Sequence, residues 1–178
     1  GASTVTTVRI ERSPRRILAG LSYFGDPFHA SAGWTEENEI GRLWTRLGQY
    51  LALEECPYPP PAESFEVCVQ NHTSPVTGEF EVFVGFEVAD ATAVPVELCV
   101  KVLPAADYAV LTLRGDQLRG EEAAVDEWLA ATGHERVLPV EIQRYDERFL
   151  GVDRLEESEL DVLVPVRPRE PERTGPPE

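Results

Sequence analysis

Metal ligands and catalytic signatures are scarce in this sequence. Its 178 residues include three cysteines and three histidines, and the cysteines Cys56, Cys68 and Cys99 form no C-x-x-C pair. Because zinc sites usually place their ligands in closely spaced pairs, we expect no bound metal. The motifs G-x-S-x-G, G-x-G-x-x-G and the P-loop, which mark nucleophilic serines and nucleotide sites, are missing as well. We therefore expect no cofactor and assign no catalytic residue.

Long apolar runs are missing too. No stretch approaches the ~18 apolar residues that a membrane helix requires, and the first residues lack the basic and then apolar pattern of a signal peptide. We expect a cytoplasmic protein without a membrane partner, in which the odd number of cysteines remains as free thiols.

Positive charge is in short supply. The chain has 16 Lys and Arg against 32 Asp and Glu, which gives a formal net charge of −16. Contacts to the phosphates of DNA or RNA need a basic surface, so we expect no direct nucleic-acid binding by this chain. An acidic surface instead attracts cations, either small molecules or basic patches of a protein. The simplest alternative is that the acidity only keeps the protein in solution.

Hydrophobic periodicity predicts two halves with the same order of elements. In the first half we predict strands over 5–12, 16–24, 65–69 and 80–88, and a helix of about 16 residues that begins at Thr35. In the second half we predict strands over 97–103, 108–113, 137–145 and 160–166, and a helix capped by Asp116 that ends at Gly133. Prolines mixed with charges predict a disordered tail over 168–178.

The two halves are related by an internal repeat. Five residues recur 90 positions later in one register: Pro14, Ala19, Leu21, Gly25 and Asp26 are matched by Pro104, Ala109, Leu111, Gly115 and Asp116. Two β-α-β-β units that each have one apolar face bury those faces together. We therefore predict an α+β fold, in which duplicated β-α-β-β units form an antiparallel sheet with two helices on one side and a ligand cleft at the pseudo-twofold axis. We expect one domain over 1–167, with pseudo-repeats over 5–90 and 95–167.

The order and spacing of several short motifs resemble the GyrI-like small-molecule-binding domain, which also serves as the effector-binding domain of bacterial transcription activators and multidrug sensors. The motifs are VRIE at 8–11, GLSYFG at 20–25, EIGRLW at 39–44, VGFEV at 84–88, LPAADYAV at 103–110 and LDVLVPV at 160–166. The similarity spans residues 5–167. It implies a cleft lined by aromatic side chains, with a buried carboxylate that selects lipophilic cations.

The sequence departs from the family pattern at the expected acid. The family carries E-x-Y on the strand after the second helix, whereas this chain has Gln143-Arg144-Tyr145. Glu141 lies on the same strand face as Gln143 and Tyr145, because side chains alternate with period two. Either Glu141 takes over the acidic role, or the cleft has no acid and the ligand is neutral. The simplest alternative is that Glu141 is a solvated strand residue.

Aromatic residues complete the expected binding site. Phe83 shares a strand face with Glu81 and Glu87, which suits a cleft of mixed polar and aromatic character. Trp34 precedes the first helix, either as a lid or as a packing residue at the helix start. Trp44 and Trp128 lie on apolar helix stripes and are assigned to the core. The expected ligand-binding residues are Tyr23, Trp34, Phe83, Tyr108, Glu141, Gln143 and Tyr145.

Three functions remain open at this point. The first is a binding module, either stand-alone or an excised effector domain, that senses or sequesters a lipophilic, cationic small molecule. The second is a hydrolase of strained cyclopropane-bearing compounds, as the resemblance allows, which would use a cleft carboxylate and a tyrosine. Since an amide cannot accept a proton, Gln143 makes this chemistry depend on Glu141 or another acid. The third is a protein-interaction module like a gyrase inhibitor, which would bind a basic protein partner.

Overall fold

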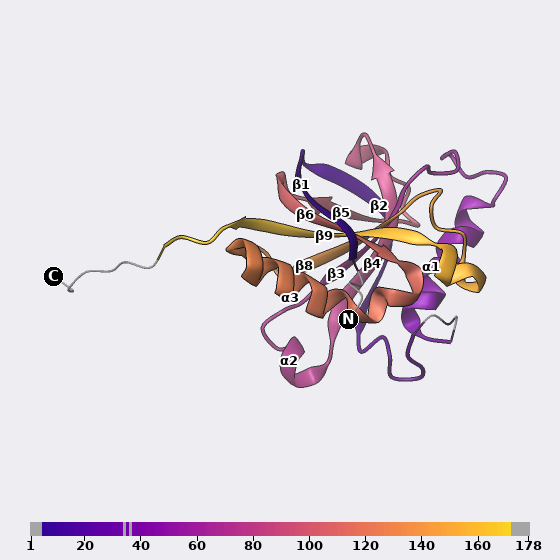
Figure 1. The fold of residues 1–178 in the computed structure, drawn as a ribbon. Coiled ribbons are helices and arrows are strands. Elements are labelled where there is room, and N and C mark those ends of the chain that lie inside the picture. The colour runs from indigo at the N-terminus through magenta and orange to yellow at the C-terminus, as the bar shows by residue number, and fades with distance from the viewer. Residues whose placement is uncertain (1–4, 34, 36, 172–178) are drawn as a thin grey trace.

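A single antiparallel sheet of nine strands organises the molecule. The computed structural model describes residues 5–33, 35 and 37–171. The strand order is β1-β6-β9-β8-β3-β4-β2-β5, and β7 pairs with β9 outside this path (Figure 1). The strands are β1 (Val5–Ser13), β2 (Arg16–Gly25), β3 (Ser64–Val69), β4 (Phe80–Val88), β5 (Cys99–Leu103), β6 (Ala106–Arg114), β7 (His134–Arg136), β8 (Val140–Tyr145) and β9 (Glu159–Pro168).

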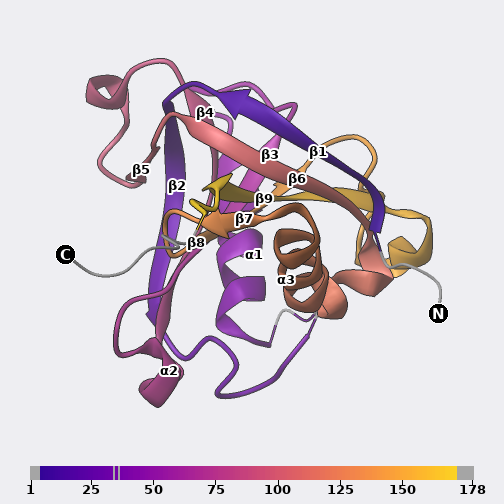
Figure 2. The same ribbon diagram turned by 60° about the vertical axis from the view of Figure 1, so that its left-hand side comes forward.

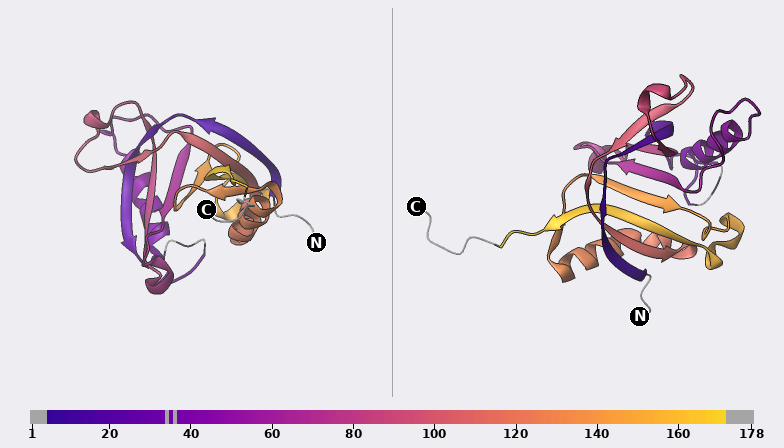
Figure 3. Two further views of the ribbon diagram at one scale, coloured as in Figure 1. Left: turned by 90° about the vertical axis from the view of Figure 1, so that its left-hand side faces the viewer. Right: turned by 90° about the horizontal axis from the view of Figure 1, so that it is seen from above.

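Two helices lie on one side of this sheet. They are α1 (Glu39–Leu51), which packs against β2 and β4, and α3 (Glu121–Thr132), which packs against β6 and β9, so that each helix covers its own half of the sheet (Figures 2 and 3). A third helix, α2 (Ser74–Thr77), is a single turn between β3 and β4. The 3₁₀ turns are Ala91–Ala93, Gly115–Gly120 and Val152–Glu157. No helix among the described residues combines the length and the apolar character needed to cross a membrane.

The strand order has an approximate twofold symmetry. From the edge of the sheet to its centre, the strands of one half are β5-β2-β4-β3, and those of the other half are β1-β6-β9-β8. The edge strand of each half of the sheet comes from the other half of the sequence. β1 precedes β2 in sequence but pairs with β6, and β5 precedes β6 but pairs with β2. Pro14 and Pro104 lie in the two short connections at these exchanges. The predicted α+β fold with duplicated β-α-β-β units is confirmed.

The central strands are covered on both faces. On the helix face, α1 packs with β2 and β4 in one cluster and α3 packs with β6 and β9 in another, and Trp44 contacts both clusters. The opposite face has its own core, which includes Leu18, Phe65, Phe83 and Ile142, all of them at most 1% exposed. Residues in the middle of β3, β4 and β8 are therefore buried whichever way they point.

Some predicted element boundaries are wrong. The first helix is capped by Asn38, whose Oδ1 accepts from the Gly41 N–H at 2.8 Å, and so begins later than predicted from Thr35. Thr35 Oγ1 instead accepts from the Glu37 N–H, which fixes the turn before the helix. Residues 115–120 form a 3₁₀ turn, and α3 begins only at Glu121, although it ends at left-handed Gly133 as predicted.

The predicted strands also differ in the second half. The strand expected over 137–145 begins only at Val140, as β8, because Pro139 before it has no N–H for a ladder, and the short strand β7 that precedes it was not predicted. Pro168, expected to begin the tail, is the last residue of β9. Residues 172–178 of the expected tail lie outside the described residues.

Glycine at position 20 is required by the close approach of β2 and β4. A Cβ at Gly20 would collide with the carbonyl oxygen of Val84. We expect Gly20→Ala to lower the free energy of unfolding by about 1–3 kcal/mol, since the backbone must shift to make room. Gly48→Ala is the matched control. Its added methyl group meets nothing within 4 Å on α1, so we expect a gain of about 0.5–1 kcal/mol from helix propensity. Urea unfolding of both variants tests this, and equal effects would contradict the close approach.

Candidate functional site

A group of polar side chains interrupts the apolar helix face at the pseudo-twofold axis. β3 and β8 pair there, with Glu66 opposite Gln143 and Cys68 opposite Glu141. Paired residues point to the same face, so side chains from both strands meet beneath the helices. We call the following six residues the axial cluster: Trp44 from α1, Glu66 from β3, Glu121 from α3, and Glu141, Gln143 and Tyr145 from β8.

Hydrogen bonds connect the members of the axial cluster. The Tyr145 hydroxyl donates to Gln143 Oε1 at 2.5 Å, and Gln143 Nε2 donates to Glu121 Oε2 at 3.2 Å. These two bonds fix the orientation of the Gln143 amide. Trp44 Nε1 donates to Glu66 Oε1 at 2.8 Å. Each helix thus contributes a hydrogen-bonding side chain to the axial cluster.

Glu66 is a buried acid without a counter-ion. Glu66 is 6% exposed, and no cationic side chain among the described residues lies within ion-pair distance of its carboxylate. Burial raises the pKa of Glu66 to about 6, against the opposing effect of the Trp44 hydrogen bond. At neutral pH the group is therefore mostly ionised, at a cost in free energy.

Glu121 and Glu141 form a second acidic position. Burial strongly raises the pKa of Glu121, and a hydrogen bond to Glu141 and the charges of Glu141 and Glu66 raise it further. Glu121 therefore keeps its proton at neutral pH. Arg136 Nη1 lies 3.6 Å from Glu141 Oε1, which is an ion pair but too long for a hydrogen bond. This oxygen is buried and finds no hydrogen-bond donor among the described residues.

A buried acid on the opposite face shows the contrast. Asp161 is 1% exposed and accepts hydrogen bonds from Thr112 at 2.7 Å, Arg144 at 3.0 Å and Arg148 at 2.8 Å. Burial alone would raise the pKa of Asp161, but the bonds from Arg148, Thr112 and Arg144 together lower it. Asp161 is thus a paired structural acid, whereas Glu66 has only an indole N–H.

Aromatic rings enclose the axial cluster. The Trp44 ring meets Tyr145 edge-on with centroids 5.4 Å apart, and Tyr145 meets Phe149 in the same manner at 4.9 Å. Gln143 and Tyr145 are each 9% exposed. Glu66 therefore lies behind Trp44 and is shielded from solvent.

The structure brings together three of the predicted site residues, Glu141, Gln143 and Tyr145. Tyr23 lies on the same sheet face but packs with the α1 cluster, and its hydroxyl donates to the Asp26 carbonyl at 3.4 Å. Trp34 lies outside the described residues.

Phe83 and Tyr108 point to the opposite face of the sheet. They are 1% and 2% exposed within its core, and the Tyr108 hydroxyl donates to the Pro104 carbonyl at 2.9 Å. The interpretation that Phe83 faces a polar cleft is therefore wrong. Glu81 and Glu87, which share its face, pair with Lys101 and Arg16 respectively.

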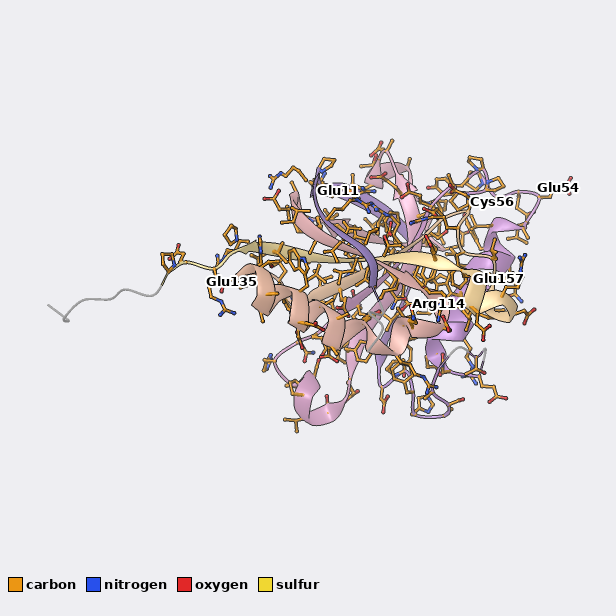
Figure 4. The ribbon with its side chains drawn as sticks, in the orientation of Figure 1. Glu11, Glu54, Cys56, Arg114, Glu135 and Glu157 are labelled. Atoms are coloured by element: carbon orange, nitrogen blue, oxygen red, sulfur yellow. The ribbon has the colours of Figure 1, made fainter. Side chains whose placement is uncertain are left out.

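Two acids of the axial cluster were not predicted. Glu66 alternates with Phe65 and Val67, a pattern typical of a strand with one solvated face. Glu121 lies within the helix predicted after Asp116, and no pattern in the sequence singled it out as a site residue. In contrast, acids such as Glu54 and Glu157 do lie exposed at the surface (Figure 4). No local pattern in the sequence indicates that Glu66 is buried. Its burial follows from the strand order, which places β3 between two other central strands.

Comparisons with known proteins agree with this architecture. A family model described as an integron-associated effector-binding protein, Cass2, matches residues 9–166. No curated protein matches the sequence.

Solved structures share the fold at low sequence identity. The C-terminal domain of EcmrR is 13% identical, with a TM-score of 0.66 over 91% of this chain and 98% of that one. SAV2435, solved with bound tetraphenylphosphonium, is 13% identical, with a TM-score of 0.61 over 91% and 94%. The Vibrio cholerae integron cassette protein VCH_CASS2 is 13% identical, with a TM-score of 0.59 over 92% and 97%. Together with the family model, these folds confirm the resemblance to a GyrI-like effector-binding domain.

The unpaired charge of Glu66 makes a prediction about stability. A raised pKa in the folded state favours folding below the unfolded value of 4.5 and disfavours it once pH passes about 6. We expect Glu66→Gln to raise the free energy of unfolding by about 2 kcal/mol at pH 8, with the gain nearly absent at pH 4.5. Exposed Glu54→Gln is the control and should show no such pH dependence. A Glu66→Gln variant that is less stable than the native protein at pH 8 would contradict the assignment.

Proposed function

The chain belongs to the family of integron-associated effector-binding proteins, and we propose that its effector is a lipophilic organic cation held by the axial cluster. The observation that carries this proposal is Glu66, a carboxylate that is 6% exposed and has no ion pair with any described residue. We assign the chain a role in sensing or sequestering such a cation.

Electrostatics favours a cation over a neutral molecule. An ionised carboxylate buried without a counter-ion destabilises the empty protein, and an incoming positive charge removes that penalty. The rings of Trp44 and Tyr145 can add cation–π attraction of roughly 0.5–2 kcal/mol each. Structural acids such as Asp161 offer no such opportunity, because arginines already neutralise them.

Apolar surroundings favour a lipophilic ligand. The axial cluster lies between the α1 core, with Leu43, Leu47 and Val84, and the α3 core, with Val125 and Val162. A cation with large apolar groups would bury those groups against these residues, and each square ångström removed from water contributes roughly 25 cal/mol. Tetraphenylphosphonium, the ligand of SAV2435, has this chemistry.

Gln143 does not remove the charge from the site. The family pattern expects an acid at this position, but Glu66 lies directly opposite on the neighbouring strand. Its carboxylate supplies the missing charge from β3. Gln143 instead holds Glu121 through its amide N–H and accepts the Tyr145 hydroxyl. We therefore propose that Glu66 takes the role of the acid that the family pattern expects at position 143, and that Glu141 does not fill this role by itself.

Tryptophan fluorescence tests the proposal, because ligand entry displaces Trp44. We expect tetraphenylphosphonium to change the emission saturably, whereas neutral triphenylphosphine oxide should bind at least ~10-fold more weakly. Glu66→Gln should weaken the cation by at least ~10-fold, or about 1.4 kcal/mol. The surface variant Glu54→Gln is the matched control and should bind as the native chain does. Equal affinities for the cation and the phosphine oxide, or full binding by Glu66→Gln, would refute a cation site at Glu66.

A further inference from the structure

We propose that the axial cluster accepts two positive charges, one at Glu66 and one at the Glu121–Glu141 pair, and that its preferred ligands are aromatic dications. This inference rests on the cation-binding role proposed above and adds the charge and shape of the ligand.

The two acidic positions are separate but lie on one face. Glu66 lies beneath Trp44 on the α1 side, whereas Glu121 belongs to α3 and contacts β8. Glu66 pairs with Gln143, so Glu141, two residues away on β8, is its diagonal neighbour. Diagonal positions in an antiparallel ladder lie about 7–8 Å apart. A flat ligand with a positive group at each end of an aromatic ring matches this spacing.

Neither position has a cationic side chain among the described residues that is close enough to donate a hydrogen bond to its carboxylates. Glu66 is nine-tenths buried and has no cation among the described residues. At the second position, Glu141 Oε1 is fully buried and receives no hydrogen bond from the described residues. Arg136 is too distant to donate to it and also contacts Asp126 at 3.3 Å. Among the described residues, the proton of Glu121 is left as the donor to Glu141, and an N–H donor that arrives with a ligand can take its place.

The two acidic positions differ in how much of their negative charge is compensated. The titratable groups that face the cluster are Glu66, Cys68, Glu121, Glu141, Tyr145 and Arg136. Burial raises the pKa of the Cys68 thiol and the Tyr145 hydroxyl, so both stay neutral. Glu121 keeps its proton and is hydrogen-bonded to Glu141, which forms an ion pair with Arg136. Glu66 is left as the one uncompensated charge in the cluster, and a monocation neutralises it.

A second positive charge requires that Glu121 ionise. Its neutral carboxyl releases a proton to solvent, and the resulting carboxylate pairs with the second cationic group of the ligand. One proton leaves and one positive charge enters, so the total charge of the site is unchanged by this step. Because a proton is released, raising the pH favours the dication more than the monocation.

Titration calorimetry with para-bisamidinobenzene and benzamidine tests the inference, because these probes differ by one amidinium group. At pH 8 we expect the bisamidine to bind at least ~10-fold more tightly, beyond the twofold statistical advantage of two identical groups. Repeating the titrations in phosphate and in Tris, which differ in ionisation enthalpy, counts the protons released. We expect close to one more proton for the bisamidine than for benzamidine. At pH 6 the preference should fall below ~3-fold.

Variants assign the effect to the second acidic position. Glu121→Gln should reduce the bisamidine preference to the statistical factor and abolish the additional proton, whereas Glu54→Gln should retain both. Should Glu121→Gln fold poorly, the proton count and pH dependence of the native protein decide the question alone. Equal affinities and equal proton counts for the two amidines overturn the inference, even where tetraphenylphosphonium still binds. If neither amidine nor tetraphenylphosphonium binds, the cation-binding role itself fails.

Discussion

The antiparallel pairing of β3 with β8 is the contact on which the rest of the molecule depends. It joins the two halves of the sheet at the pseudo-twofold axis, and its register sets Glu66 opposite Gln143 and Cys68 opposite Glu141. A slip of one residue in either strand would turn that strand's polar side chains to the other face and bring apolar residues such as Phe65 in their place. The apolar cores and the axial cluster are therefore specified together, by one ladder.

Two buried acids differ in whether arginines neutralise their charge. Asp161 accepts hydrogen bonds from Arg144 and Arg148, and these bonds tie β9 to β8 and to the segment that follows it. Glu66, on the other face, is held only by the Trp44 indole. The fold supplies arginines to Asp161, whereas no arginine among the described residues forms an ion pair with Glu66, so the charge of Glu66 is left without a counter-ion. In the function proposed above, this instability of the empty site is the source of its affinity for a cation.

Local patterns predicted most of the fold. Period-two alternation placed β2 and β4 within a residue of their observed limits, and Gly133 was identified as the end of α3. The repeat of 90 positions predicted the duplicated units, because it compares the chain with itself and needs no knowledge of strand pairing. The start of α1 was missed because Thr35 and Asn38 are both good capping residues, and only the observed bond to Gly41 distinguishes them.

The acid that we propose for the site, Glu66, could not be predicted from the sequence, because its position depends on which strands pair. Alternation along β8 is local, so Glu141, Gln143 and Tyr145 were correctly placed on one face. Which strand lies beside β8 depends on contacts between residues far apart in sequence, and Glu66 is reached only through that pairing. In the function proposed above, a carboxylate on either strand serves the same ligand, because β3 and β8 both point side chains into the same space. The acid can thus move across the ladder while the fold is retained, and a motif sought in one strand misses the exchange.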